Sequence, residues 1–143
     1  MSTPVHRLTP AFGVAGQLDV DDIAALAAQG WRSLVCNRPD GETADQPASA
    51  ELVRAAAAHG LAWRHIPVVS GQWRDADVAA FAEAVRTLPA PVLAFCRTGT
   101  RSIHLWALAM TDTLDAESLQ RIAADAGYVL HPAVLRRAPG ASP

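Results

Sequence analysis

The feature of the sequence that most constrains the fold is a pair of apolar segments joined by a short glycine-containing loop. The first segment is Pro91–Phe95 and the second is Ile103–Met110. A short apolar run is typical of a buried strand, whereas the longer second run predicts a buried helix. A strand that passes through a tight loop into a helix is a unit of parallel α/β sheets. We therefore expect an α/β fold built around these two segments.

The rest of the chain repeats this alternation of strands and helices. Strands are expected at residues 12–16, 31–36 and 61–69, and helices at 20–29, 50–59, 76–86, 116–126 and 132–137. This order predicts a mostly parallel sheet with right-handed crossovers and helices on both faces. Ligands bind beyond the carboxyl ends of such strands, so the loops at residues 37–42 and 70–73 should form the walls of one cleft.

Polar residues mark where the expected helices begin. Asp19, with Asp22 at the third helical position, predicts a capping box for the first helix. Ser49 is expected to cap the second helix and Asp75 the third, because short polar side chains accept hydrogen bonds from free N–H groups at helix starts.

The composition of the chain limits the classes of protein to which it could belong. The chain has 143 residues, half of them hydrophobic, and a net charge of −2, which predicts one folded domain and argues against disorder or nucleic-acid binding. No apolar run is long enough to span a membrane, and the first residues lack the pattern of a signal peptide. Two cysteines without metal-ligand spacing favour a cytoplasmic protein with neither metal nor cofactor. The chain end from about residue 138 is expected to fray.

The loop between the two apolar segments carries the chemistry. Its residues are Cys96, Arg97, Thr98, Gly99, Thr100, Arg101 and Ser102. Its backbone N–H groups and the positive end of the following helix favour an anion and stabilise a thiolate, so we expect Cys96 to be a nucleophile. The Arg101 guanidinium suits two oxygens of a tetrahedral oxyanion. Ser102 is expected to donate to the thiolate or to cap the helix.

Several motifs, in this order, resemble the protein-tyrosine-phosphatase-like superfamily. They are Gly16-Gln17-Leu18, Asn37-Arg38-Pro39-Asp40-Gly41-Glu42, His65-Ile66-Pro67-Val68, and Phe95–Ser102 followed by Leu105–Ala109. More closely, they resemble the phosphatase-like domain of the bacterial beta-lactamase-hydrolase-like proteins. The likeness runs from Val5 to Met110 and less clearly to Leu135.

The resemblance implies a dual-specificity-phosphatase-like fold and hydrolysis of a small phosphorylated substrate through a phosphocysteine. In that mechanism Cys96 attacks phosphorus, Arg101 binds the phosphoryl oxygens together with the loop residues 97–100, and Ser102 helps the thiolate leave. The resemblance leads us to expect weak activity on aryl phosphates.

The chain departs from the phosphatase pattern in three places. Four residues separate Cys96 from Arg101, one fewer than in protein-tyrosine phosphatases. Phe95 stands where those enzymes have histidine, and Ser70 where the dual-specificity enzymes supply an acidic residue. The shorter interval resembles the rhodanese sulfurtransferases, which implies a persulfide on Cys96 and a sulfur-bearing substrate. The missing acid also leaves open a non-catalytic, oxyanion-binding module.

The loop at residues 37–42 offers further candidate site residues. Asp40 or Glu42 would serve as the acid or orient Arg101, or else simply form a turn with Gly41. Arg38 would add positive potential to the cleft or pair with a local carboxylate.

Four other residues have two interpretations each. Asp75 and Asp77 would replace the missing acid, although the start of a helix explains both residues more simply. Cys36 belongs to the core or is a resolving thiol for an oxidised Cys96. Trp73 presents an aromatic face to a substrate or forms a hydrophobic lid.

Overall fold

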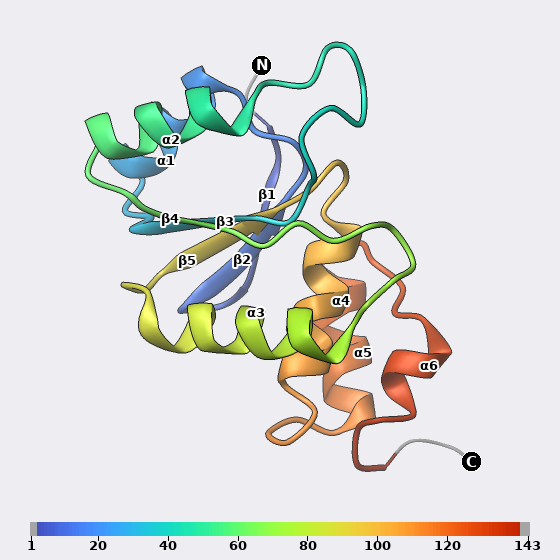
Figure 1. Cartoon of the computed structure of the whole chain (residues 1–143). Coiled ribbons are helices and arrows are strands. Elements are labelled where there is room, and N and C mark those ends of the chain that lie inside the picture. The colour runs from blue at the N-terminus through green and yellow to red at the C-terminus, as the bar shows by residue number, and fades with distance from the viewer. Residues whose placement is uncertain (1–2, 141–143) are drawn as a thin grey trace.

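The computed structural model of the chain describes residues 3–140 and contains one five-stranded sheet. The strands are β1 Val5–Thr9, β2 Phe12–Ala15, β3 Ser33–Cys36, β4 Ala62–His65 and β5 Val92–Phe95. The helices are α1 Val20–Ala28, α2 Ser49–Ala58, α3 Asp75–Thr87, α4 Thr100–Ala109, α5 Ala116–Asp125 and α6 Pro132–Leu135. The predicted α/β class is confirmed, and Figure 1 shows the arrangement.

The sheet has the strand order β1-β2-β5-β3-β4, so β5 is the central strand. It pairs in parallel with both β2 and β3, and β4 extends the parallel part beyond β3. β1 was not predicted. It pairs antiparallel with β2 at the edge of the sheet, and its residues are mixed in polarity and mostly half-buried. An edge strand of that kind lacks the continuous apolar run of a central parallel strand.

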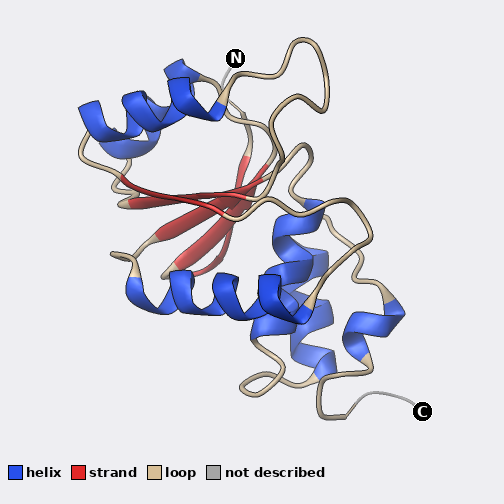
Figure 2. Ribbon diagram, in the orientation of Figure 1, coloured by secondary structure: helices blue, strands red, loops and turns tan. Residues whose placement is uncertain are grey.

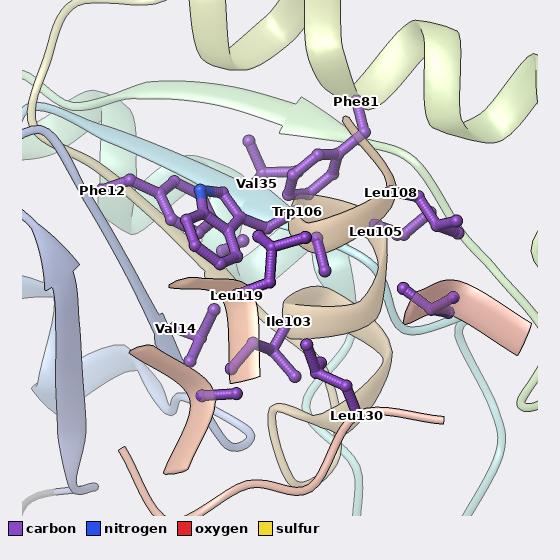
Figure 3. Close-up of a cluster of buried hydrophobic side chains, with 14 of the residues drawn as sticks. Phe12, Val14, Val35, Phe81, Ile103, Leu105, Trp106, Leu108, Leu119 and Leu130 are labelled. Atoms are coloured by element: carbon purple, nitrogen blue, oxygen red, sulfur yellow. The ribbon is translucent and has the colours of Figure 1, made fainter. Parts of the chain in front are cut away.

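Helices cover both faces of the sheet, as predicted (Figure 2). α1 and α2 lie on one face, and the other four helices lie on the opposite face (Figure 1). Successive side chains of a strand point to opposite faces of the sheet, so each strand contributes apolar side chains to the core on both faces. On β3, for example, Leu34 packs with α1 and α2, whereas Val35 belongs to the cluster that contains Phe81 and Trp106 (Figure 3).

The helix that follows the cysteine loop is buried along almost its whole length. Every residue of α4 from Arg101 to Leu108 is buried, which confirms the prediction of a buried helix. Trp106 stacks on Phe12 with ring centroids 6.0 Å apart, and Ile103 lies in the same cluster (Figure 3). The dense packing on all sides fixes the beginning of α4, and therefore the loop before it.

Of the three side-chain helix caps predicted from the sequence, the structure contains one. Asp19 and Asp22 form the predicted capping box of α1. The predicted side-chain caps of α2 and α3 are wrong: their cap residues are Ala48 and Arg74, with no side-chain hydrogen bond. At α2 a carboxylate from a distant loop satisfies the first N–H groups instead, as described below.

The chain end is more ordered than predicted. Ala138 is buried, and the Pro139 carbonyl accepts a hydrogen bond from the Ala116 amide, so fraying does not begin at residue 138. The remainder of the predicted tail, residues 141–143, lies outside the described residues. Within residues 3–140, no helix combines the length and the apolar content needed to cross a membrane.

Candidate active site

Cys96 lies at the carboxyl end of the central strand and is almost completely buried, with 1% of its surface exposed. The backbone N–H of Gly99 donates to its Sγ atom at 3.1 Å. The loop is held against the end of β2, where the Gln17 amide donates to the Arg97 carbonyl at 3.1 Å. Gly16 permits this approach, because a Cβ atom there would lie only 3.1 Å from that carbonyl oxygen. The loop therefore curls closely around the sulfur.

The turn of the loop depends on a glycine in a left-handed conformation. Gly99 has a φ of 91° and is the residue before the first turn of α4, with no side-chain cap. Tyr128 packs against this position and donates its hydroxyl proton to the Thr98 carbonyl at 2.8 Å. A side chain at residue 99 would collide with the Tyr128 hydroxyl. Because Gly99 is the cap residue of α4 and no side chain caps this helix, the prediction that Ser102 caps it is wrong.

A carboxylate from the loop after β3 holds the arginine of the site. Glu42 accepts hydrogen bonds from both terminal nitrogens of Arg101, and the Val68 carbonyl accepts a third at 3.0 Å. The hydrogen bond to Glu42 raises the pKa of Arg101, and the nearby Cys96 sulfur acts in the same direction. Both protons of one terminal nitrogen are thereby engaged. The Nε atom donates no hydrogen bond to another group among residues 3–140, and the guanidinium lies close to the Cys96 sulfur.

Arg38 also donates hydrogen bonds within this network. Its Nε atom donates to Glu42 at 2.9 Å, and one terminal nitrogen donates to the Gln17 side chain at 3.0 Å. Arg38 itself is buried, so it pairs with the local carboxylate, one of its two predicted roles. The hydrogen bonds from Arg101 and Arg38 hold the pKa of Glu42 below its usual value. Glu42 is therefore an anchored anion that orients Arg101, one of the roles predicted for it.

Ser102 contacts a neighbouring strand end rather than the sulfur. It is fully buried and donates its only hydroxyl proton to the Asn37 side-chain oxygen at 2.9 Å. The Asn37 amide group in turn donates to the Ile66 carbonyl at 2.9 Å. This chain of hydrogen bonds ties α4 to the ends of β3 and β4. Sequence reasoning did not identify Asn37 as the partner, because nothing in the sequence pairs residues that lie 65 positions apart.

Asp40, the candidate acid of the loop at residues 37–42, contacts the start of α2. Both Asp40 carboxylate oxygens accept hydrogen bonds from Ser49, one from its amide and one from its hydroxyl. These bonds lower the pKa of Asp40, so it remains ionised and serves as the cap that α2 lacks in its own sequence. Asp75, one of the two candidates at the start of α3, lies exposed at the surface and pairs with Arg137 at 3.4 Å. Neither position suits a proton donor beside Cys96.

A cavity of about 430 Å³ adjoins the cysteine loop. Ser70, Gly71 and Trp73 line it together with residues of the cysteine loop, so the segment 70–73 lies at the site as expected. The loop at residues 37–42 was expected to form a second wall, but none of its residues lines this cavity. The residues that line it include Arg97, Thr98, Thr100 and Arg101. Among the described residues, no group of three or more histidine, cysteine or acidic side chains is placed to hold a metal ion.

Sequence reasoning missed the third wall of this cavity. Residues 129–132, which follow Tyr128, approach the loop from the far end of the chain. The only signal in the sequence was an apolar pair, Val129 and Leu130, between two expected helices. Such a short segment carries no periodicity that would assign it to a site.

A central strand that ends in a buried cysteine, followed by a loop, an oriented arginine and a buried helix, defines the class of cysteine phosphatase-like α/β domains. The chain belongs to the family described as "Beta-lactamase hydrolase-like protein, phosphatase-like domain", which it matches over residues 5–113. The resemblance found in the sequence is thus confirmed.

Individual relatives agree with this membership. The beta-lactamase hydrolase-like protein of Xylella fastidiosa is 38% identical over 97 residues, which are 68% of this chain but only 22% of that protein. A putative phosphatase of Neisseria meningitidis is 30% identical in its crystal structure, with a TM-score of 0.82 over 92% of this chain and 94% of that one. Kinase associated phosphatase shares the fold, with a TM-score of 0.75 at 17% identity, covering 95% of this chain and 92% of that one.

Proposed function

We propose that this domain transfers sulfur through a persulfide on Cys96. One observation carries the proposal: neither carboxyl group of the loop at residues 37–42 is free to give a proton. Glu42 is bound to Arg101 and Arg38, and Asp40 is bound to Ser49. Hydrolysis of ordinary phosphate monoesters benefits from a general acid that protonates the leaving oxygen. Transfer of a sulfane sulfur releases a weak base and needs no such acid.

The two steps of the transfer balance without a further reactant. The Cys96 thiolate attacks the outer sulfur of thiosulfate, the sulfur–sulfur bond breaks, and sulfite leaves with the electron pair. The product is a persulfide anion on Cys96. An acceptor thiolate or cyanide then attacks the outer sulfur, and the Cys96 thiolate leaves. The Gly99 N–H, 3.1 Å from Sγ, and the Arg101 guanidinium stabilise the negative charge in both steps.

The size of the loop supports the same chemistry. Only four residues separate Cys96 from Arg101, so the loop offers one backbone N–H fewer than a phosphatase loop. The sulfur is also almost completely enclosed. A single additional sulfur atom requires less space and fewer donors than a phosphoryl group with three oxygens.

A second candidate function is favoured by the comparisons. The family carries the name of a phosphatase-like domain, and the Neisseria meningitidis relative is described as a putative phosphatase. In this alternative Cys96 attacks phosphorus, the phosphorus–oxygen bond breaks, and water later releases phosphate from the phosphocysteine. Without a proton donor, the reaction would be confined to esters whose leaving group is a weak base, such as nitrophenyl phosphate.

Mass spectrometry of the intact protein tests the proposal. Wild-type protein treated with thiosulfate should gain the mass of one sulfur atom, and cyanide should remove it as thiocyanate. Cys96→Ser should gain nothing. Cys36→Ser is the matched control, because Cys36 is the other cysteine, and it should gain sulfur like the wild type.

The same samples distinguish the alternatives. Phosphate release from nitrophenyl phosphate that depends on Cys96, with no gain of sulfur, would overturn sulfur transfer in favour of the phosphatase. Saturable sulfate binding that is lost in Arg101→Ala, with no turnover of either substrate, would overturn both in favour of a binding module.

A further inference from the structure

The cavity beside the cysteine loop is larger than an inorganic sulfur donor requires. Its volume of about 430 Å³ lies in the range typical of small-molecule sites, roughly 300–1,000 Å³. A water molecule takes about 30 Å³ in the liquid, and thiosulfate occupies the space of only a few waters. An inorganic ion at the mouth of the loop would therefore leave most of the cavity unfilled.

The side chains that line the cavity include both positively charged and apolar groups. Arg97 and Arg101 belong to the loop side, and no carboxylate is among the residues that line the cavity. Trp73, Leu130 and Pro132 supply apolar surface. Val129 lines the same space and is 90% exposed, so its side chain is accessible to a ligand. This arrangement suits a molecule with an anionic group and an apolar body.

Trp73 forms a fixed aromatic wall of the cavity. Its ring stacks on His104 with centroids 4.8 Å apart and planes 12° from parallel. His104 is itself held at both ring nitrogens, by the Thr100 carbonyl at 2.7 Å and the His131 amide at 2.9 Å. Burial lowers the pKa of His104, so the ring is neutral. The indole N–H is buried with no partner among the described residues, so stacking rather than a hydrogen bond places Trp73.

We propose that this cavity binds the organic part of an anionic substrate, and that Trp73 and Val129 select donors with an aromatic or aliphatic body over inorganic thiosulfate. The inference rests on the proposed function for the reaction itself but not for binding. With an arenethiosulfonate, Cys96 attacks the outer sulfur and the arenesulfinate leaves with the electron pair. The sulfonyl oxygens would face the guanidinium groups, and the arene would lie against Trp73.

Binding is tested in Cys96→Ser protein, which cannot react. Titration with benzenesulfonate and with sulfate, followed by calorimetry, should show benzenesulfonate binding at least about tenfold more tightly, a difference of about 1.4 kcal/mol. Trp73→Ala should abolish this preference and Trp73→Phe should retain it. Val129→Glu, a surface change that folding tolerates, should weaken benzenesulfonate binding by about tenfold. Val53→Glu, an exposed valine on α2, is the matched control and should have no effect.

Turnover gives the second measurement. Wild-type protein should use benzenethiosulfonate with a kcat/KM at least about tenfold above that for thiosulfate, and Trp73→Ala should reduce the ratio to near one. Equal binding of sulfate and benzenesulfonate, or equal effects of the two valine variants, would overturn the cavity proposal even if Cys96 carries sulfur. A preference for benzenesulfonate that depends on Trp73, without any persulfide, would support the cavity and overturn sulfur transfer.

Discussion

The carboxylate of Glu42 accepts hydrogen bonds from both terminal nitrogens of Arg101, at 2.8 and 2.9 Å, across 59 positions of the sequence. A guanidinium whose two terminal nitrogens are both held by hydrogen bonds keeps its Nε edge in a fixed direction. Arg101 is therefore set in place before a substrate arrives. This pre-organisation is the geometric basis of the activity proposed for Cys96.

Replacing Glu42 should weaken catalysis without removing the nucleophile. Glu42→Gln keeps the size of the side chain but provides one amide donor that faces the guanidinium, so Arg101 should lose its fixed orientation. We expect kcat/KM for a sulfur donor to fall by about 10- to 100-fold, since misplacement by about 1 Å costs that much. Steady-state kinetics measure this loss. Glu83→Gln, on the exposed side of α3, is the control and should match the wild type.

The same variant should show a pH-dependent loss of stability. Because Arg101 lowers the pKa of Glu42 below its usual 4.5, the ionised carboxylate stabilises the folded state above that pH. The contribution is lost as the pH falls through the lowered pKa of the folded state. Urea denaturation should show wild type more stable than Glu42→Gln at pH 7, with the difference shrinking below about pH 4.5. A difference that stays constant across this range would contradict the assignment.

The hydrogen bond from Ser102 to Asn37 should matter for stability. Ser102→Ala leaves the Asn37 side-chain oxygen buried without this donor, which should lower the free energy of unfolding by about 1–3 kcal/mol. A double-mutant cycle with Asn37→Ala measures the pairwise energy, expected to be about 0.5–3 kcal/mol. Strictly additive effects of the two substitutions would show that the hydrogen bond contributes nothing.

A side chain at residue 99 should destabilise the protein for two separable reasons. Gly60 is the matched control, because it has a φ of 74° but open space where a Cβ atom would stand. Gly60→Ala should therefore cost only the backbone strain, about 1–2 kcal/mol. Gly99→Ala adds the collision with Tyr128 and should cost at least about 1 kcal/mol more, measured by denaturation. Similar losses for both variants would mean that Tyr128 moves aside freely.

Cys36 should not rescue Cys96 from oxidation. Burial raises the pKa of the Cys36 thiol to about 12, and only a thiolate attacks a sulfenic acid efficiently. Cys36 is also packed among the core residues beneath α1 and α2. After peroxide and then a reductant, wild type and Cys36→Ser should recover activity equally. Full recovery of the wild type alone would instead establish Cys36 as a resolving thiol.

Much of the fold follows from local patterns in the sequence. The apolar run 91–95 and the apolar helix after it were predictable, because burial on both sides demands continuous apolar residues. The capping box of Asp19 and Asp22 was predictable for a similar reason, since both partners lie within one helical turn. The edge strand β1 was not, because its half-buried residues carry no comparable pattern.

The sequence by itself determined the α/β class, the strand–loop–helix unit and the identity of the cysteine and arginine in the loop. Only the tertiary structure decided that Glu42 orients Arg101, that Asp40 caps α2, that Ser102 bonds to Asn37, and that residues 129–132 complete a cavity. The physical reason is how far apart in the sequence the interacting residues lie. Hydrophobic periodicity and helix caps act between residues a few positions apart, whereas the partners of each polar group at this site are chosen by where the sheet ends its strands.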